Sequence, residues 1–350
     1  MRRSGRHTAL ALTAIAGVAI AAASFTARAE RQAPAAAATD RVAAAARAFL
    51  DTLTPPLRAK ANIDLNAKTR TIWSNLPTGI AMQVGATTRN GVKFGEMNPA
   101  QEKAALALLA TALSREGYEK VMATVQADEM LAQSSGGRGN VVFGRKEYFF
   151  AILGTPSAGN TWMLQFGGHH LAVNVTYAGA AHVLTPTHTG AQPATYSIEG
   201  KTVRPLGDEN DKALALVNSL TPEQQKQAVL GTTVRNLVLG PGEDGKTIAP
   251  EGLKASGLNG TQRAQLLDLA GEWVRILGDD AANARMAEIK ARLDETYFAW
   301  AGPTAPGSAI YFRIQGPAVF IEYAAQGNAD HIHTIYRDPT NDYAAKATVR

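Results

Sequence analysis

Three sequence landmarks occur twice in this 350-residue chain, in the same order, and this repetition constrains the fold more than any other feature. The matched segments are residues 49–55 with 216–222, 91–93 with 252–254, and 147–154 with 295–302. The offset between the copies shrinks from 167 to 161 and then to 148 residues, which places the length differences in loops. We therefore predict an internal duplication, with copy one over about 41–200 and copy two over about 205–345.

Within each predicted copy, helix signals come first and strand signals follow. A Thr-Pro pair starts a helix at 54–55 and again at 221–222, with the Thr hydroxyl as N-cap and Pro at N1. Asn98 and Asn259 each precede an amphipathic pattern, which predicts helices over 102–114 and 263–277.

The strand signals are segments rich in aromatic and β-branched residues. They predict a strand near 148–153 and a hairpin from 161–166 to 170–177, with a matching set in copy two. The expected fold class is α+β: a unit of helices followed by a small antiparallel sheet, duplicated and packed about a pseudo-two-fold axis. Both copies are expected to form one domain over residues 41–345.

The N-terminus has the three parts of a secretory signal peptide over residues 1–29. Arginines at 2, 3 and 6 precede an uncharged, alanine-rich run, and Ala27-Arg28-Ala29 predicts cleavage after Ala29. Residues 30–40 are expected to be a disordered tether, and the mature protein to be periplasmic or secreted. An uncleaved anchor is the alternative, because about 20 apolar residues can span a bilayer. Whether export follows the general secretory or the twin-arginine route stays open.

Charge and cysteine content exclude several classes of function. Four arginines and no acidic residue lie in the predicted signal, so its removal takes the formal charge from +5 to +1. A near-neutral mature protein is not expected to bind nucleic acid, and no integral membrane domain is expected after cleavage. The chain has no cysteine, which excludes a Cys nucleophile, Cys-ligated zinc and iron–sulfur clusters.

Residues 240–245 match the pattern Gly-x-Gly-x-x-Gly that occurs in dinucleotide-binding sites. Such a site needs a helix at the third glycine, whereas a proline-containing segment follows here. Glu243 and Asp244 would also repel a pyrophosphate. We therefore interpret the segment as a loop and expect no nucleotide cofactor.

Several strings in the mature chain resemble one protein family. They are Trp162 with Gly168-His169-His170-Leu171 and Asn174, Gly154-Thr155-Pro156, Ile321-Glu322-Tyr323, and the C-terminal stretch 331–343. On these residues the chain, from about Arg41 to Tyr343, resembles the domain of unknown function 3500 family of bacterial and fungal proteins. Phe166-Gly167 departs from the family pattern, which often has a charged residue there. The resemblance implies no particular activity.

Histidines supply the candidate site. Of the six that follow the predicted signal, four form two clusters, His169 with His170 and His331 with His333. The His-x-His spacing puts two imidazoles on one face of a strand, a common way to present nitrogen ligands to a metal. Strand geometry would send His169 and His170 to opposite faces. We expect His169, among apolar neighbours, to be the more buried, and His170 to be the first ligand, with His169 as a further candidate.

The predicted duplication sharpens this hypothesis. In copy two, Pro317 and Ala318 stand where copy one has His169 and His170, so the hairpin does not need histidine to fold. A pseudo-two-fold axis would bring His170 to the second cluster across the joint between the copies, with a carboxylate nearby. The supporting candidates are Asn174, Glu322, Arg337 and Asp338.

The sequence thus favours an exported metal-binding protein whose ion is zinc, copper or iron. A metal-dependent enzyme would be hydrolytic with zinc and oxidative with copper or iron. Two alternatives stay open. One is a metal-free polar cluster that binds a small ligand or performs acid–base chemistry; the other is a non-catalytic periplasmic binding or interaction module with structural histidines. The substrate or ligand is not identified.

Overall fold

The computed structural model describes residues 36–79, 88–135 and 141–347. The expected signal peptide over 1–29 lies outside these ranges. The first helix spans residues 36–52, so residues 36–40 of the expected tether are helical. Across these three ranges, no helix has the length and hydropathy needed to cross a membrane.

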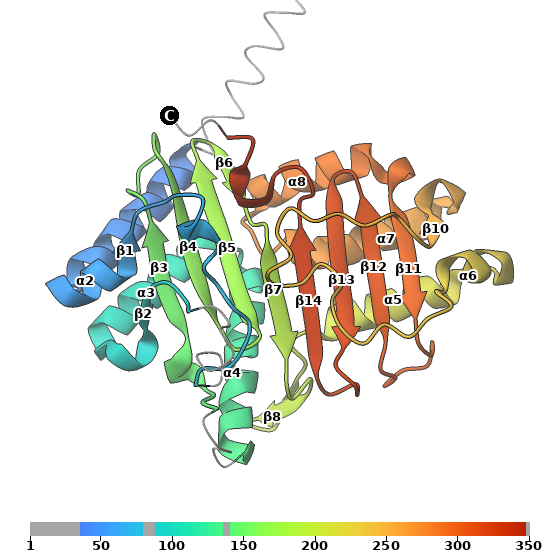
Figure 1. Cartoon of the computed structure of the whole chain (residues 1–350), viewed down its shortest axis with the longest axis horizontal. Helices are drawn as coiled ribbons and strands as arrows, with labels where there is room; N and C mark the ends of the chain where they lie inside the picture. Colours follow the sequence, from blue (N-terminus) through green and yellow to red (C-terminus); the bar gives the residue numbers. More distant parts are fainter. Residues whose placement is uncertain (1–35, 80–87, 136–140, 348–350) are drawn as a thin grey trace, which may run out of the picture.

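A twelve-stranded mixed sheet forms the centre of the fold (Figure 1). The strand order is β1-β3-β4-β5-β7-β14-β13-β12-β11-β10, with β2 added to β3 and β6 added to β5. Only β1 pairs in parallel with its neighbour, β3, among the assigned strand pairs. The bounds are β1 Asn62–Ile63, β2 Val92–Lys93, β3 Phe149–Leu153, β4 Thr161–Gly168, β5 Leu171–Ala178, β6 Ala181–Val183, β7 Thr187–Ala191, β10 Leu253–Lys254, β11 Tyr297–Ala301, β12 Tyr311–Gly316, β13 Val319–Ala325 and β14 Ile332–Arg337. A separate hairpin consists of β8 Tyr196–Ile198 and β9 Lys201–Val203.

The α-helices gather on one face of the large sheet, behind it in Figure 1. Their bounds are α2 Pro55–Ala61, α3 Pro99–Ala112, α4 Arg115–Ser135, α5 Gly207–Ser219, α6 Pro222–Ala228, α7 Gly260–Val274 and α8 Asp279–Ala291. The main hydrophobic core lies between these helices and the sheet. The opposite face is crossed by two described segments without long helices or strands, residues 62–79 and 229–252.

The local sequence signals are largely confirmed. The expected strand and hairpin of copy one correspond to β3, β4 and β5, and their matches in copy two to β11, β12 and β13. Asn98 and Asn259 form capping boxes with Gln101 and Gln262. The Thr221 hydroxyl caps α6, whereas Thr54 makes no side-chain cap hydrogen bond. Residues 240–245 form the expected loop.

A buried ion cluster connects α4 to the helices of the second half. Lys120 Nζ lies 2.7 Å from Oε1 of Glu209 on α5 and 2.8 Å from Oε2 of Glu272 on α7. The Glu209 side chain is 1% exposed, and this burial raises the pKa of its carboxyl. Burial alone would lower the pKa of Lys120, but the two carboxylates outweigh it and raise the pKa. Lys120 therefore supplies the positive charge that Glu209 needs in this position.

Replacing Lys120 with methionine is expected to lower the free energy of unfolding by about 3–5 kcal/mol, because it leaves a buried carboxylate without a counter-ion. Chemical denaturation at neutral pH measures the change. Arg115→Ala on the same helix is the control, since its side chain is 76% exposed and its ion pairs contribute little. Equal, small effects of the two variants would contradict a structural role for the cluster.

Candidate metal centre

Three imidazoles from both halves of the chain converge at one end of the sheet. His170 lies in the turn between β4 and β5, His331 immediately precedes β14, and His333 lies within β14. The Nε2 atoms of His170 and His331 are 2.9 Å apart, and those of His331 and His333 are 3.1 Å apart. One ligand atom from each residue falls within 4.8 Å of the other two. The expected meeting of His170 with the second cluster is confirmed.

Hydrogen bonding alone does not account well for this convergence. A neutral imidazole carries one N–H, so the Nε2 of His331 can donate to only one of its two neighbours. A metal held at the usual 2.0–2.1 Å by tetrahedral nitrogen ligands would place those nitrogens about 3.3 Å apart. The two neighbouring pairs, at 2.9 and 3.1 Å, are close to that value, and one nitrogen from each of the three residues lies within 4.8 Å of the others. The three side chains therefore fit a metal ion without large rearrangement.

Burial keeps these imidazoles neutral, the form that binds metals. It lowers the pKa of His333 to about 2 and that of His331 to about 4. Burial also lowers the pKa of His170 well below its ordinary value, and the neighbouring histidines add to this effect. The lone pair on each Nε2 is therefore available.

The backbone of His170 is held in an uncommon conformation. Its φ of 63° lies in the left-handed region, which non-glycine residues rarely adopt. Asn75 accepts a hydrogen bond from the His170 backbone N–H at 2.9 Å, through its own carbonyl. His188, on β7, places its Nδ1 3.2 Å from the His170 carbonyl, while its Nε2 lies 3.3 Å from Nδ2 of Asn75. Two buried residues thus fix His170 on both sides of its Cα.

His169, expected as a further metal-ligand candidate, contacts a carboxylate instead. Its Nδ1 lies 2.6 Å from Oδ1 of Asp128, a carboxylate on α4 whose side chain is fully buried. The His169 ring stacks on that of His170, with centroids 3.6 Å apart, but His169 is not one of the three converging ligands. His169 is 8% exposed and His170 only 1%, so the expectation that His169 is the more buried was wrong. Both residues form the turn itself, where strand alternation does not apply.

The four supporting candidates have partners away from the converging imidazoles. Asn174 donates to the Pro186 carbonyl at 2.8 Å. Glu322 accepts from the backbone N–H groups of Val238 and Leu239 and from the Tyr311 hydroxyl. Arg337 pairs with Asp244 and Asp342, and Asp338 with Arg285. Glu322 or Asp338 was expected to bring a carboxylate to the imidazoles, but the contacts of both residues lie elsewhere.

Sequence reasoning missed three residues that surround the cluster. His188 stood apart from both clusters, Asn75 lies in a segment without regular structure, and Asp128 lies on α4. The only sequence signal that could have identified His188 as a candidate is the small number of histidines in the chain. His182, the remaining histidine among the described residues, lies elsewhere and contacts the Thr39 hydroxyl at 2.8 Å.

Nearly the whole chain matches one protein family. The model of one family, described as a protein of unknown function (DUF3500), matches residues 35–345. The chain belongs to this family. No curated protein and no solved structure matches it significantly. Membership in DUF3500 confirms the resemblance found in the sequence, and the description of this family names no activity.

Gly190 on β7 makes room for His170. A Cβ at this position would lie 2.7 Å from the Ile332 carbonyl oxygen and 3.2 Å from the Cβ of His170. Gly190→Ala is therefore expected to lower the free energy of unfolding by about 1–3 kcal/mol, measured by chemical denaturation. Gly159→Ala is the matched control, because a Cβ there meets no atom within 4 Å. A Gly190→Ala variant as stable as the control would show that β7, β14 and His170 are not tightly packed.

Proposed function

We propose that this protein binds a divalent transition metal through His170, His331 and His333. The observation that carries the proposal is the convergence of three Nε2 atoms, with the neighbouring pairs 2.9 and 3.1 Å apart. The donor set is all nitrogen, which suits zinc, copper and iron. Three protein ligands leave one coordination position open, as catalytic metal sites do.

The His169–Asp128 pair supports a catalytic role for this centre. A buried carboxylate that holds Nδ1 fixes the tautomer and the ring orientation, and leaves Nε2 to exchange protons. The ring of His169 stacks directly on a proposed ligand. A metal-dependent enzyme with His169 as its acid–base residue is therefore the function we favour over a purely structural histidine cluster.

We also propose that the two halves are copies of one unit, so that the centre lies at their joint. Matched glycines have matched backbones: φ is 100° at Gly91 and 96° at Gly252. At both positions a Cβ would lie 2.3 Å from the carbonyl oxygen of the next strand, at Phe150 and Phe298. These shared requirements support descent from one unit.

Export is the third part of the proposal. The N-terminal sequence supports a signal peptide cleaved after Ala29, which would put the protein in the periplasm or outside the cell. N-terminal sequencing of the protein recovered from the periplasm tests this directly. A mature chain that still begins at Met1 would contradict cleavage.

Metal content tests the central proposal. Protein purified from the periplasm without a histidine tag is expected to carry near-stoichiometric metal, measured by inductively coupled plasma mass spectrometry. His170→Ala and His333→Ala are expected to lose nearly all of it, because each removes one of three ligands. His182→Ala is the matched control and is expected to retain the metal.

Circular dichroism of each variant separates loss of a ligand from loss of the fold. Metal-free wild-type protein that takes up no zinc, copper or iron on reconstitution would refute the proposal. Equal metal loss in the His182→Ala control would also refute it.

His188 is expected to act through His170 rather than as a ligand. His188→Phe removes the hydrogen bonds to His170 and Asn75, and is expected to weaken metal affinity by about 10–100-fold while the stoichiometry at saturating metal stays unchanged. Competition titration with a chelator measures the affinity. His188→Gln, which keeps a hydrogen-bonding side chain, is expected to lose less. Complete loss of metal at saturation in both variants would instead make His188 a ligand.

A further inference from the structure

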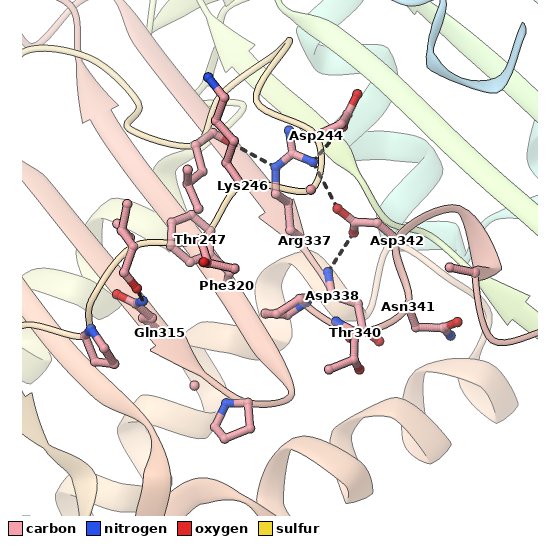
Figure 2. A pocket seen from close by; sticks show the side chains of 18 of the residues that line it. Asp244, Lys246, Thr247, Gln315, Phe320, Arg337, Asp338, Thr340, Asn341 and Asp342 are labelled. Carbon is pink, nitrogen blue, oxygen red and sulfur yellow. Dashed lines mark hydrogen bonds and ion pairs between the residues drawn. The ribbon is translucent and has the colours of Figure 1, made fainter. Parts of the chain in front are cut away.

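A second, separate site lies on the sheet face opposite the helices. It is a pocket of about 780 Å³, and none of the clustered histidines lines it. Its walls come from residues 70–71, 239–250, 315–320 and 337–345, together with the ends of strands β10 and β11 (Figure 2). Pockets of this size typically hold small organic molecules.

The floor and sides of the pocket are largely apolar and partly aromatic. Phe320, Tyr297, Tyr343, Ile248 and Pro317 all line it. Phe320 and Tyr343 are themselves buried at 2% and 7% exposure, so the surrounding core holds them in place. Such a surface matches a ligand with a flat apolar body.

The buried charges at the back of the pocket are already paired. Arg337 forms ion pairs with Asp244 and Asp342 (Figure 2). The distances are 2.8 and 2.9 Å. Asp338 forms an ion pair with Arg285 at 2.9 Å. These carboxylates are therefore not free to bind a cationic ligand.

Two polar groups in the wall have unused hydrogen-bonding capacity. Arg70 forms no ion pair or side-chain hydrogen bond with any described residue, and its Nε is buried; the guanidinium lies over the Tyr343 ring, 5.4 Å from the centroid. Gln315, 8% exposed, donates through Nε2 to the Ile248 carbonyl at 2.7 Å, while its Oε1 is buried without a partner. Buried polar groups without partners are unfavourable, and a ligand that supplies both partners relieves this. Both atoms have almost no accessible surface, so the Arg70 and Gln315 side chains must turn toward the pocket to bond a ligand.

We propose that this pocket binds a small organic carboxylate with a flat apolar body and a hydroxyl group. The carboxylate pairs with Arg70, the body lies against Phe320 and Tyr297, and the hydroxyl donates to Oε1 of Gln315. Nothing in this arrangement involves the metal ligands. The site is therefore independent of the proposed metal function.

The probe for this proposal is 4-hydroxycinnamate, compared with its neutral amide by isothermal titration calorimetry on the mature protein. The carboxylate is expected to bind about 10–100-fold more tightly than the amide, because a charge-assisted pair with Arg70 is lost in the amide. Arg70→Gln is expected to remove this preference. Arg58→Gln, an exposed arginine outside the pocket lining, is the control and is expected to keep it.

Two further comparisons complete the test. Cinnamate, which lacks the hydroxyl, is expected to bind about 2–10-fold more weakly than 4-hydroxycinnamate. His333→Ala is expected to bind the probe as well as the wild type, which separates this site from the metal centre. Absence of saturable binding, equal binding of acid and amide, or an unchanged preference in a folded Arg70→Gln variant would overturn the proposal. Equal binding of the two acids would overturn the role of Gln315.

Discussion

The antiparallel pairing of β7 with β14 is the constraint on which both the sheet and the histidine cluster depend. β7 belongs to the first half of the chain and β14 to the second, and their pairing joins the strands of both halves into one continuous sheet. Their register places Gly190 opposite His333 and His188 opposite Ile335. Because side chains alternate along a strand, a slip of one residue would turn His333 to the helix-covered face. The register that closes the core is therefore the register that assembles the cluster.

The face of the sheet that carries the cluster is covered by irregular segments, and this explains its many buried polar residues. Backbone groups in such segments have no ladder partners and need side chains to bond them. Glu322 accepts from the N–H groups of Val238 and Leu239, while Arg337 donates to the carbonyls of Leu239 and Gly240. Both residues, taken from the sequence as candidates to support a metal, hold a covering segment against the sheet. Buried charge on this face is thus largely a consequence of how it is covered.

Most of what the sequence predicted was local; the contact of His170 with His331 is the long-range exception, and it was expected from the repeat. Helix starts at Asn98 and Asn259 follow from patterns within a few residues, and so do the strands flanking His169 and His170. The His-x-His spacing likewise paired His331 with His333. Asp128 and Asn75 carry no local mark, because only tertiary packing brings a helix and an irregular segment to the turn. The expectation that His169 is more buried than His170 was wrong because it assumed strand geometry. The positive φ of His170 breaks that geometry, so the two side chains do not alternate as they would on a strand.

That φ value also bears on why the imidazole is present. A left-handed residue at a tight turn is ordinarily glycine or asparagine, which adopt this conformation with less strain. In the second half the aligned turn, Pro317-Ala318, closes its hairpin without a positive φ at Ala318. Hairpin closure therefore requires neither the strained backbone nor a histidine. The chain instead keeps a fully buried imidazole in a strained position and fixes its backbone with Asn75 and His188. Gly190 lies beside it, where a Cβ would crowd the His170 side chain. Strain kept in this way is typical of functional sites, and here it holds the Nε2 of His170 toward His331.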